Sequence, residues 1–293
     1  MTGASAQSPT AQGNTQDGVF SFLSELAREL SSGRVDLPSY PDAAARVQQA
    51  LADDSVTNER IARVVGSDAG LAARLLTMAN SALFNRAASK VSDLKVAVTR
   101  IGYDNIRTAA LAYASAQLRR AAELAPIRME LEQCWEEGVR VSALCHAMAR
   151  ECQRVRADEA MLAGLLHNIG KVYILARSLR WGEQRQALSG EVLNDWYPSI
   201  GQALIENWQL PEEIAVAVGG QLETAGHDGG PADLRDLLIV AVQMAGQMAT
   251  GNADDAALAA LPSATALGLT DSAIVRIVLE SHTDLEMLQA ALG

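Results

Sequence analysis

One short segment of the sequence places three polar side chains among residues that otherwise belong in a hydrophobic core. His167, Asn168 and Lys171 stand in the run Ala163-Gly164-Leu165-Leu166-His167-Asn168-Ile169-Gly170-Lys171. A helical histidine beside an oxygen donor suits a metal site when other helices supply further ligands. The competing interpretation is a structural histidine that makes one hydrogen bond in the core, and an isolated His–Asn pair favours this interpretation.

The elements that position these side chains are predicted to be helices. Hydrophobic residues make up 49% of the 293 residues but aromatic residues only 4%, a composition that suits stacked helices with a core of Leu, Ala and Val. Apolar residues repeat at helical spacing, as in Leu71, Leu75 and Ala79, and Asp68 is expected to cap that helix. No alternation typical of strands persists for more than a few residues. The sequence therefore predicts an all-α fold.

Capping residues and prolines predict several helix boundaries in the second half of the chain. Asp158 is expected to cap a helix that continues through Ile169. Pro198 and Pro211 are expected in the first turns of two further helices, where a missing N–H costs no hydrogen bond. Two short helices are expected to close the chain after Pro262.

Charge and composition exclude several classes of function. The formal net charge is −11 and the pI is near 4.9, which argues against a general nucleic-acid-binding surface and against binding to an anionic membrane. No apolar run reaches the roughly 18 residues that a membrane span needs. Residues 1–17 lack the basic start and apolar stretch of a signal peptide and are expected to form a disordered tail. We therefore expect a cytoplasmic protein whose three cysteines are reduced core thiols.

The order and spacing of several short motifs carry a resemblance to a known family. From about residue 19 to residue 250 the chain resembles the HD-related output domain (HDOD) family, a non-hydrolytic branch of the HD phosphohydrolase superfamily. The motifs are Leu37-Pro38-Ser39-Tyr40-Pro41, Ser67–Leu71, Ala79–Phe84 and Ala97–Gly102 in the first half, and Trp135, Gly164–Lys171, Gly201–Leu204 and Trp208–Pro211 in the second.

The resemblance implies a particular domain organisation. It implies a multi-helix HD-like bundle with a helical N-terminal lobe packed against it. The tail of residues 1–17 would be followed by an HDOD domain over residues 18–252, with its lobes at about 18–122 and 123–252. Residues 253–293 would form a C-terminal helical extension.

The resemblance also shows which ligand positions this chain has lost. Catalytic HD proteins hold one metal ion with a first histidine, a His–Asp doublet and a distant aspartate. Here Glu137 stands at the first position, His167-Asn168 at the doublet and Gly246 at the closing aspartate. Only the doublet histidine is retained, and a divalent ion that needs at least three good ligands has too few. The expectation is no metal, no cofactor and no catalytic residue, because no metal-bound water could be activated.

Three further positions complete this degenerate HD pocket. Lys171, which follows the doublet in catalytic HD proteins, is retained. Tyr197 replaces a histidine expected before the Gly201 segment, and Gln221 opens the pair that would be two histidines. Together with Glu137, His167, Asn168 and Gly246, these residues are candidates for ligand binding or for interaction.

The resemblance implies a non-catalytic regulatory module that binds other proteins in bacterial signalling. The expected partners are signalling proteins such as a sensor kinase, a response regulator or a cyclic-di-nucleotide enzyme, and a homodimer remains open. One alternative is a metal-dependent phosphohydrolase in which Glu137, His167 and Asn168 form an atypical ligand set. Another is a nucleotide or small-molecule sensor that uses the vacated cleft near Lys171.

Overall fold

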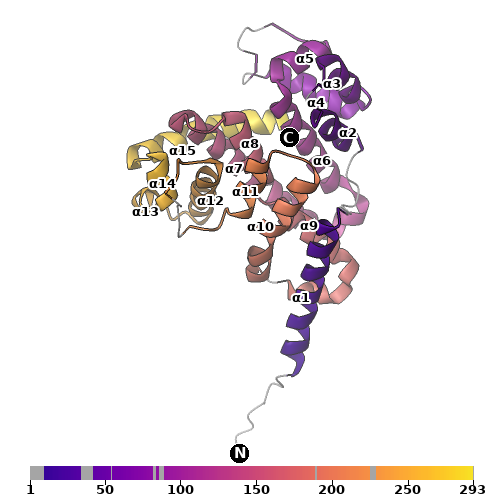
Figure 1. Ribbon diagram of the computed structural model, residues 1–293, viewed down its shortest axis with the longest axis vertical. Coiled ribbons are helices and arrows are strands. Elements are labelled where there is room, and N and C mark those ends of the chain that lie inside the picture. Colours follow the sequence, from indigo (N-terminus) through magenta and orange to yellow (C-terminus); the bar gives the residue numbers. More distant parts are fainter. Residues whose placement is uncertain are drawn as a thin grey trace, which may run out of the picture.

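The computed structural model is built of helices, and the prediction of an all-α fold is confirmed (Figure 1). It describes residues 10–33, 42–53, 55–81, 84–85, 89–188, 190–224 and 229–292, and none of these residues lies in a strand. The Leu37–Pro41 motif lies outside the described residues. The elements are α1 (Thr10–Ser31), α2 (Asp42–Leu51), α3 (Asn58–Val65), α4 (Ala69–Asn80), α5 (Leu94–Ile101), α6 (Tyr103–Arg120), η1 (Ala122–Ile127), α7 (Arg128–Cys152), α8 (Ala157–Leu166), α9 (Ile169–Ser178), η2 (Leu179–Ala187), α10 (Gly190–Asn207), α11 (Glu212–Gly219), α12 (Leu234–Thr250), α13 (Asp255–Ala259), α14 (Pro262–Leu267) and α15 (Asp271–Leu292).

Helices α2–α6 form an N-terminal lobe whose core follows the predicted stripes. Leu71 and Leu75 of α4 are buried, and the Asp68 side chain accepts a hydrogen bond from the Leu71 backbone N–H at 2.9 Å, which confirms the predicted cap. Val139 of α7 and Met161 of α8 belong to the same hydrophobic cluster. The lobe is therefore packed against the helices that follow it, with a shared core.

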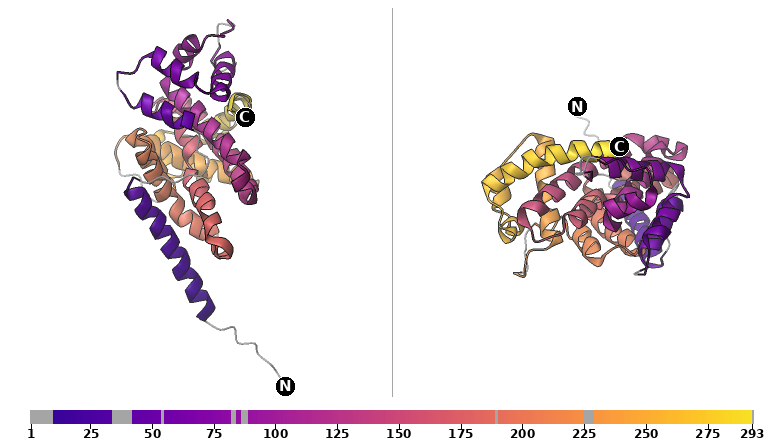
Figure 2. Two further views of the ribbon diagram at one scale, coloured as in Figure 1. Left: turned by 90° about the vertical axis from the view of Figure 1, so that its right-hand side faces the viewer. Right: turned by 90° about the horizontal axis from the view of Figure 1, so that it is seen from above.

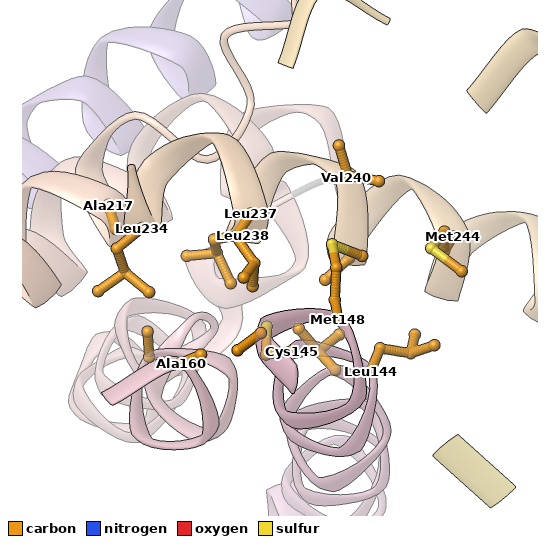
Figure 3. Close-up of a cluster of buried hydrophobic side chains, with 14 of the residues drawn as sticks. Leu144, Cys145, Met148, Ala160, Ala217, Leu234, Leu237, Leu238, Val240 and Met244 are labelled. Atoms are coloured by element: carbon orange, nitrogen blue, oxygen red, sulfur yellow. The ribbon is translucent and has the colours of Figure 1, made fainter. Parts of the chain in front are cut away.

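The second lobe is organised around α7, which packs against α8, α12 and α15. Figure 3 shows Cys145 and Met148 of α7 facing side chains of α12 such as Leu238, and all three belong to one buried hydrophobic cluster. Cys145 is completely buried, and burial strongly raises the pKa of its thiol. This environment is that of a reduced core thiol.

Two long helices flank the lobes. Leu23, Leu26 and Leu30 of α1 are buried in a cluster with residues of α9 and α10, while the N-terminal end of α1 points away from the rest of the molecule (Figure 2). Helix α15 lies along α7 and reaches α4 and α6 of the N-terminal lobe. None of the described helices is long and apolar enough to span a bilayer.

The two chain ends differ from the sequence-based expectation. Helix α1 begins at Thr10, inside the segment expected to be a disordered tail, because a helix whose later turns are packed can extend into polar residues. At the other end, α15 has 22 residues and is not a short helix. Its buried apolar residues belong to two different hydrophobic clusters. They therefore do not form the single continuous stripe from which one long helix could be predicted.

Two predicted boundaries inside the second lobe are also wrong. Asp158 lies in the first turn of α8, whose N-cap is Arg156, and α8 ends at Leu166 before a turn leads into α9. Pro198 lies within α10, since that helix begins at Gly190. The proline removes one helical hydrogen bond, and the carbonyl concerned belongs to the exposed Asn194, which water can reach.

Candidate functional site

The His167–Asn168 doublet forms the turn between α8 and α9, and close packing of α7 on α8 brings Glu137 opposite it. A Cβ on Gly164 would lie 2.6 Å from the Cα of Ser142, so only glycine allows this approach. The Ser142 hydroxyl then donates a 2.7 Å hydrogen bond to the carbonyl of Met161. These contacts fix the register of α7 against α8, and hence the distance from Glu137 to His167.

His167 is 1% exposed and is held by its backbone neighbours. Its Nδ1 lies 2.7 Å from the carbonyl oxygen of Gly164, which can only accept, so Nδ1 carries a hydrogen and donates it. Its Nε2 lies 3.7 Å from Oε1 of Glu137 and has no hydrogen-bond partner. Nδ1 thus makes a structural hydrogen bond, and Nε2 faces a carboxylate.

The Glu137 carboxylate is the centre of the cluster. Its Oε2 lies 3.5 Å from Nζ of Lys171 and accepts a 3.3 Å hydrogen bond from Nδ2 of Asn168. Burial disfavours the ionised form, but contact with His167, Lys171 and Asn168 outweighs burial and lowers the pKa of Glu137 to about 2. The carboxylate is therefore ionised and neutralised by protein groups at any physiological pH.

Tyr197 and Gln221 fill the space on the other side of the doublet. Gln221 is fully buried and donates 2.7 Å hydrogen bonds to the carbonyls of His167 and Val218. The Tyr197 hydroxyl donates to Oε1 of Gln221 at 3.4 Å, and its ring lies 4.5 Å below Nζ of Lys171. Burial raises the pKa of Tyr197, so the hydroxyl stays protonated. Side chains occupy the region expected to be a vacated cleft.

Gly246 does not join this cluster. It lies on an exposed face of α12, and no atom outside the local helix backbone is within 4 Å of the position that its Cβ would take. The buried face of α12 includes Ala241, Met244 and Ala245, and the next residue along the helix is turned about 100° away from Ala245. The structure brings together six of the seven predicted pocket residues and leaves Gly246 apart.

One partner of the cluster was missed by the sequence analysis. The carbonyl of Cys134 accepts a 2.7 Å hydrogen bond from Nδ2 of Asn168, which orients the amide toward Glu137. Cys134 precedes Glu137 by three residues on α7, so helical spacing alone places both on one face. Burial raises the pKa of the Cys134 thiol to about 11, which leaves it protonated and unreactive.

The donor set of this cluster does not fit a divalent cation. Over the described ranges, no three His, Cys, Asp or Glu side chains come together as a possible metal site. Glu137 and His167 are two donors, while Asn168 directs its NH₂ group toward the same carboxylate. The Lys171 ammonium stands beside Glu137 and supplies the positive charge that a metal ion would bring.

The fold matches several solved structures. An HDOD domain protein of unknown function from Geobacter sulfurreducens has a TM-score of 0.65 at 23% identity, over 94% of this chain and 99% of its own. A proposed metal-dependent phosphohydrolase from Shewanella amazonensis SB2B has a TM-score of 0.65 at 22% identity, over 92% and 99% of the two chains. A proposed signal transduction protein from Marinobacter aquaeolei VT8 has a TM-score of 0.59 at 20% identity, over 94% of this chain but 66% of its own. At these identities the likeness establishes the fold.

The family itself follows from the sequence. No curated protein matches this chain. The HDOD domain family matches residues 37–222, which is well over half of the 293 residues and runs from α2 through α11. The expected resemblance is confirmed: the chain belongs to the HDOD domain family.

Proposed function

We propose that this chain is a non-catalytic signal-transduction module of the bacterial cytoplasm, which acts by binding partner proteins on a degenerate HD fold. The observation that carries the proposal is that the Glu137 carboxylate is held by the Lys171 ammonium, with 3.5 Å between Nζ and Oε2, and by the Asn168 amide, at two positions that the resemblance aligns with metal ligands of HD phosphohydrolases. An ammonium group neutralises the carboxylate but cannot coordinate and activate a water molecule.

Burial of the remaining residues supports the same function. His167, Asn168 and Tyr197 are each at most 3% exposed, and Gln221 is fully buried. A phosphoester would have to displace these side chains and break their hydrogen bonds, which costs about 1–3 kcal/mol for each buried group left unpaired. A nucleotide or small-molecule sensor in this region meets the same obstacle. We therefore propose that the domain acts by binding partners on its surface.

The partners we propose are signalling proteins such as a sensor kinase, a response regulator or a cyclic-di-nucleotide enzyme. The Marinobacter aquaeolei protein of the same fold, named a proposed signal transduction protein, supports this class of partner. The net charge of −11 argues against nucleic acid as the partner. A homodimer is compatible with the same role.

The alternative function is a metal-dependent phosphohydrolase with an atypical ligand set. One observation favours it: Nε2 of His167 is buried without a hydrogen-bond partner and faces Glu137 at 3.7 Å. The Shewanella amazonensis relative is also named a proposed metal-dependent phosphohydrolase. For this chain to bind a metal, Lys171 would have to leave Glu137 and a third anionic ligand would be needed.

A combined measurement separates the two functions. The purified chain is analysed for bound metals and assayed for phosphoester hydrolysis with Mg²⁺, Mn²⁺ and Zn²⁺, beside His167→Gln and the control His282→Gln on the exposed face of α15. We expect no stoichiometric transition metal and no turnover above that of His167→Gln. Turnover that is lost in His167→Gln but kept in His282→Gln would establish the phosphohydrolase. Capture of a signalling protein from the native host that also binds His167→Gln supports the proposed module.

A further inference from the structure

A second surface of the molecule is an apolar groove between α12, α13 and α15. Its volume is about 250 Å³. Met244 and Leu258 are buried at 1% and 4% exposure and belong to the adjoining core. All the residues that form the groove follow residue 222, so it lies outside the part of the chain that the HDOD family matches. The apolar lining is Met244, Met248, Leu258, Val275, Val278 and Leu279.

One wall of the groove exposes large apolar side chains to solvent. Val275 is 47% exposed and Leu279 is 64% exposed, and both line the groove. They are four residues apart on α15, so their side chains lie one above the other on the same face of the helix. Adjoining apolar side chains around a hollow mark an interaction site more often than scattered single ones do. The half-buried Met248 adds a flexible side chain that can adapt to an apolar partner.

Acidic side chains lie at the α13 wall of this groove. Asp255 lines it, and the exposed Asp254 directly before it is the N-cap of α13. Glu280, which follows Leu279, is already paired with Arg150 of α7. Arg276 is the only lysine or arginine in the segment 251–292, and it forms an ion pair with a glutamate of α7. The groove therefore has an apolar floor with two aspartates at one wall, which attract a positively charged partner.

We propose that this groove binds a basic amphipathic helix of a partner protein. Apolar side chains one turn apart on that helix would contact Met248, Val275 and Leu279, and its Lys or Arg residues would face Asp254 and Asp255. A second copy of this chain is disfavoured because it would bring the same aspartates and a net charge of −11 to the interface.

This inference builds on the proposed function, since it gives the regulatory module a surface and a class of partner. It does not involve the polar cluster around Glu137. A failure of the groove to bind would leave the metal and turnover measurements unchanged. A metal-dependent turnover would overturn the proposed function without affecting the groove.

The test uses two model peptides of about 18 residues, or five helical turns, one of Leu and Lys and one of Leu and Glu in the same amphipathic pattern. Binding of each labelled peptide to the full chain is measured by fluorescence anisotropy. We expect the Leu/Lys peptide to bind, and Leu279→Ser to weaken its binding by about tenfold. The control Met129→Ser removes a side chain that is 72% exposed on α7, and should leave binding unchanged. Asp255→Asn should weaken binding about threefold, and added salt should weaken it further.

Three outcomes would overturn the inference. Equal binding by Leu279→Ser and Met129→Ser would show that the peptide recognises only the overall negative charge. Equal binding of the Leu/Glu peptide would exclude a basic partner. A dimer of the wild-type chain that dissociates in Leu279→Ser, measured by gel filtration with light scattering, would show that a second copy covers the groove. If Leu279→Ser does not fold, as judged by circular dichroism, Val275→Ser tests the same wall.

Discussion

At the scale of single residues, the character of the polar cluster depends on Glu137. Its Oε2 lies 3.5 Å from Nζ of Lys171 and 3.3 Å from Nδ2 of Asn168. The pKa of Glu137 falls from 4.5 to about 2 against the effect of burial. A group that binds protons more weakly in the folded state stabilises that state when ionised, so the cluster links stability to pH.

Glu137→Gln is expected to flatten the acid limb of the stability curve. The stabilisation from ionised Glu137 is complete above about pH 5 and is lost as the pH falls toward 2, because the pKa in the folded state lies near 2 and the ordinary value is 4.5. The side chain is 37% exposed, which limits the loss at pH 7 to about 1 kcal/mol. Urea unfolding at a series of pH values measures both effects. The control is Glu136→Gln at the exposed neighbouring residue, and identical curves for the two variants would contradict the prediction.

A pair of glycine substitutions should have opposite effects on stability. A Cβ on Gly170 would lie 2.0 Å from the carbonyl oxygen of Tyr197, so Gly170→Ala must push α9 away from α10 and should cost more than about 3 kcal/mol. Gly246→Ala meets no neighbouring group within 4 Å and replaces glycine inside α12, which should stabilise by about 0.5–1 kcal/mol. Thermal unfolding measures both changes. Equal effects would show that the helix packing around Gly170 tolerates a methyl group.

The resemblance to HD proteins named most members of the polar cluster, and the structure brings these together because their positions are fixed along well-defined helices. His167 and Asn168 are adjacent, Lys171 follows within one turn, and Glu137 is aligned by the packing of α7 on α8. Gly246 was predicted less well because a position along α12 does not specify the rotation of that helix. Its rotation is set by which apolar residues the adjacent helices bury, which is a tertiary property.

At the scale of elements, one of the two predicted aspartate caps is correct and the other is wrong. Asp68 caps α4 as expected. Asp158 does not cap α8, because its carboxylate forms a 3.0 Å ion pair with Arg156 and the helix begins with Arg156 as its N-cap, two residues earlier. The ion pair between Asp158 and Arg156 could not be predicted from the sequence alone. Short helices such as α3 were readily predicted, since one apolar stripe of Ile61 and Val65 accounts for their packing.

Removal of the buried carboxylate between α15 and α7 should destabilise the protein. Asp284 is 2% exposed, and its Oδ2 accepts hydrogen bonds from Nδ1 of His146 at 2.9 Å and from Arg150 at 3.2 Å. Asp284→Asn keeps the size but loses the charge, and should cost about 1–3 kcal/mol in urea unfolding.

Glu280→Gln provides the matched control for this change. Glu280 contacts the same Arg150 at 2.9 Å but is 50% exposed, so its loss should cost less than about 0.5 kcal/mol. A cost for Glu280→Gln as large as that for Asp284→Asn would mean that burial of the carboxylate does not decide how firmly α15 is docked.

At the scale of the whole molecule, α15 connects the two lobes. Ile274 and Ile277 of α15 belong to the hydrophobic cluster of α7, α8 and α12, whereas Leu288 belongs to the cluster of the N-terminal lobe. The predicted boundary near residue 122 falls between α6 and η1, but Val139 of α7 already contributes to the N-terminal core. Shared side chains of this kind favour one cooperative unfolding unit.

Leu288→Ala should therefore destabilise both lobes together. The side chain is 1% exposed in the N-terminal cluster, and its truncation should cost about 2–5 kcal/mol. Because α15 joins the clusters, hydrogen exchange should speed up by a similar factor in α3 of one lobe and in α12 of the other. Leu279→Ala removes a side chain of α15 that is 64% exposed and should leave both rates nearly unchanged. Faster exchange confined to α3 would show that the lobes unfold separately, with α15 remaining on α7 as part of the second lobe alone.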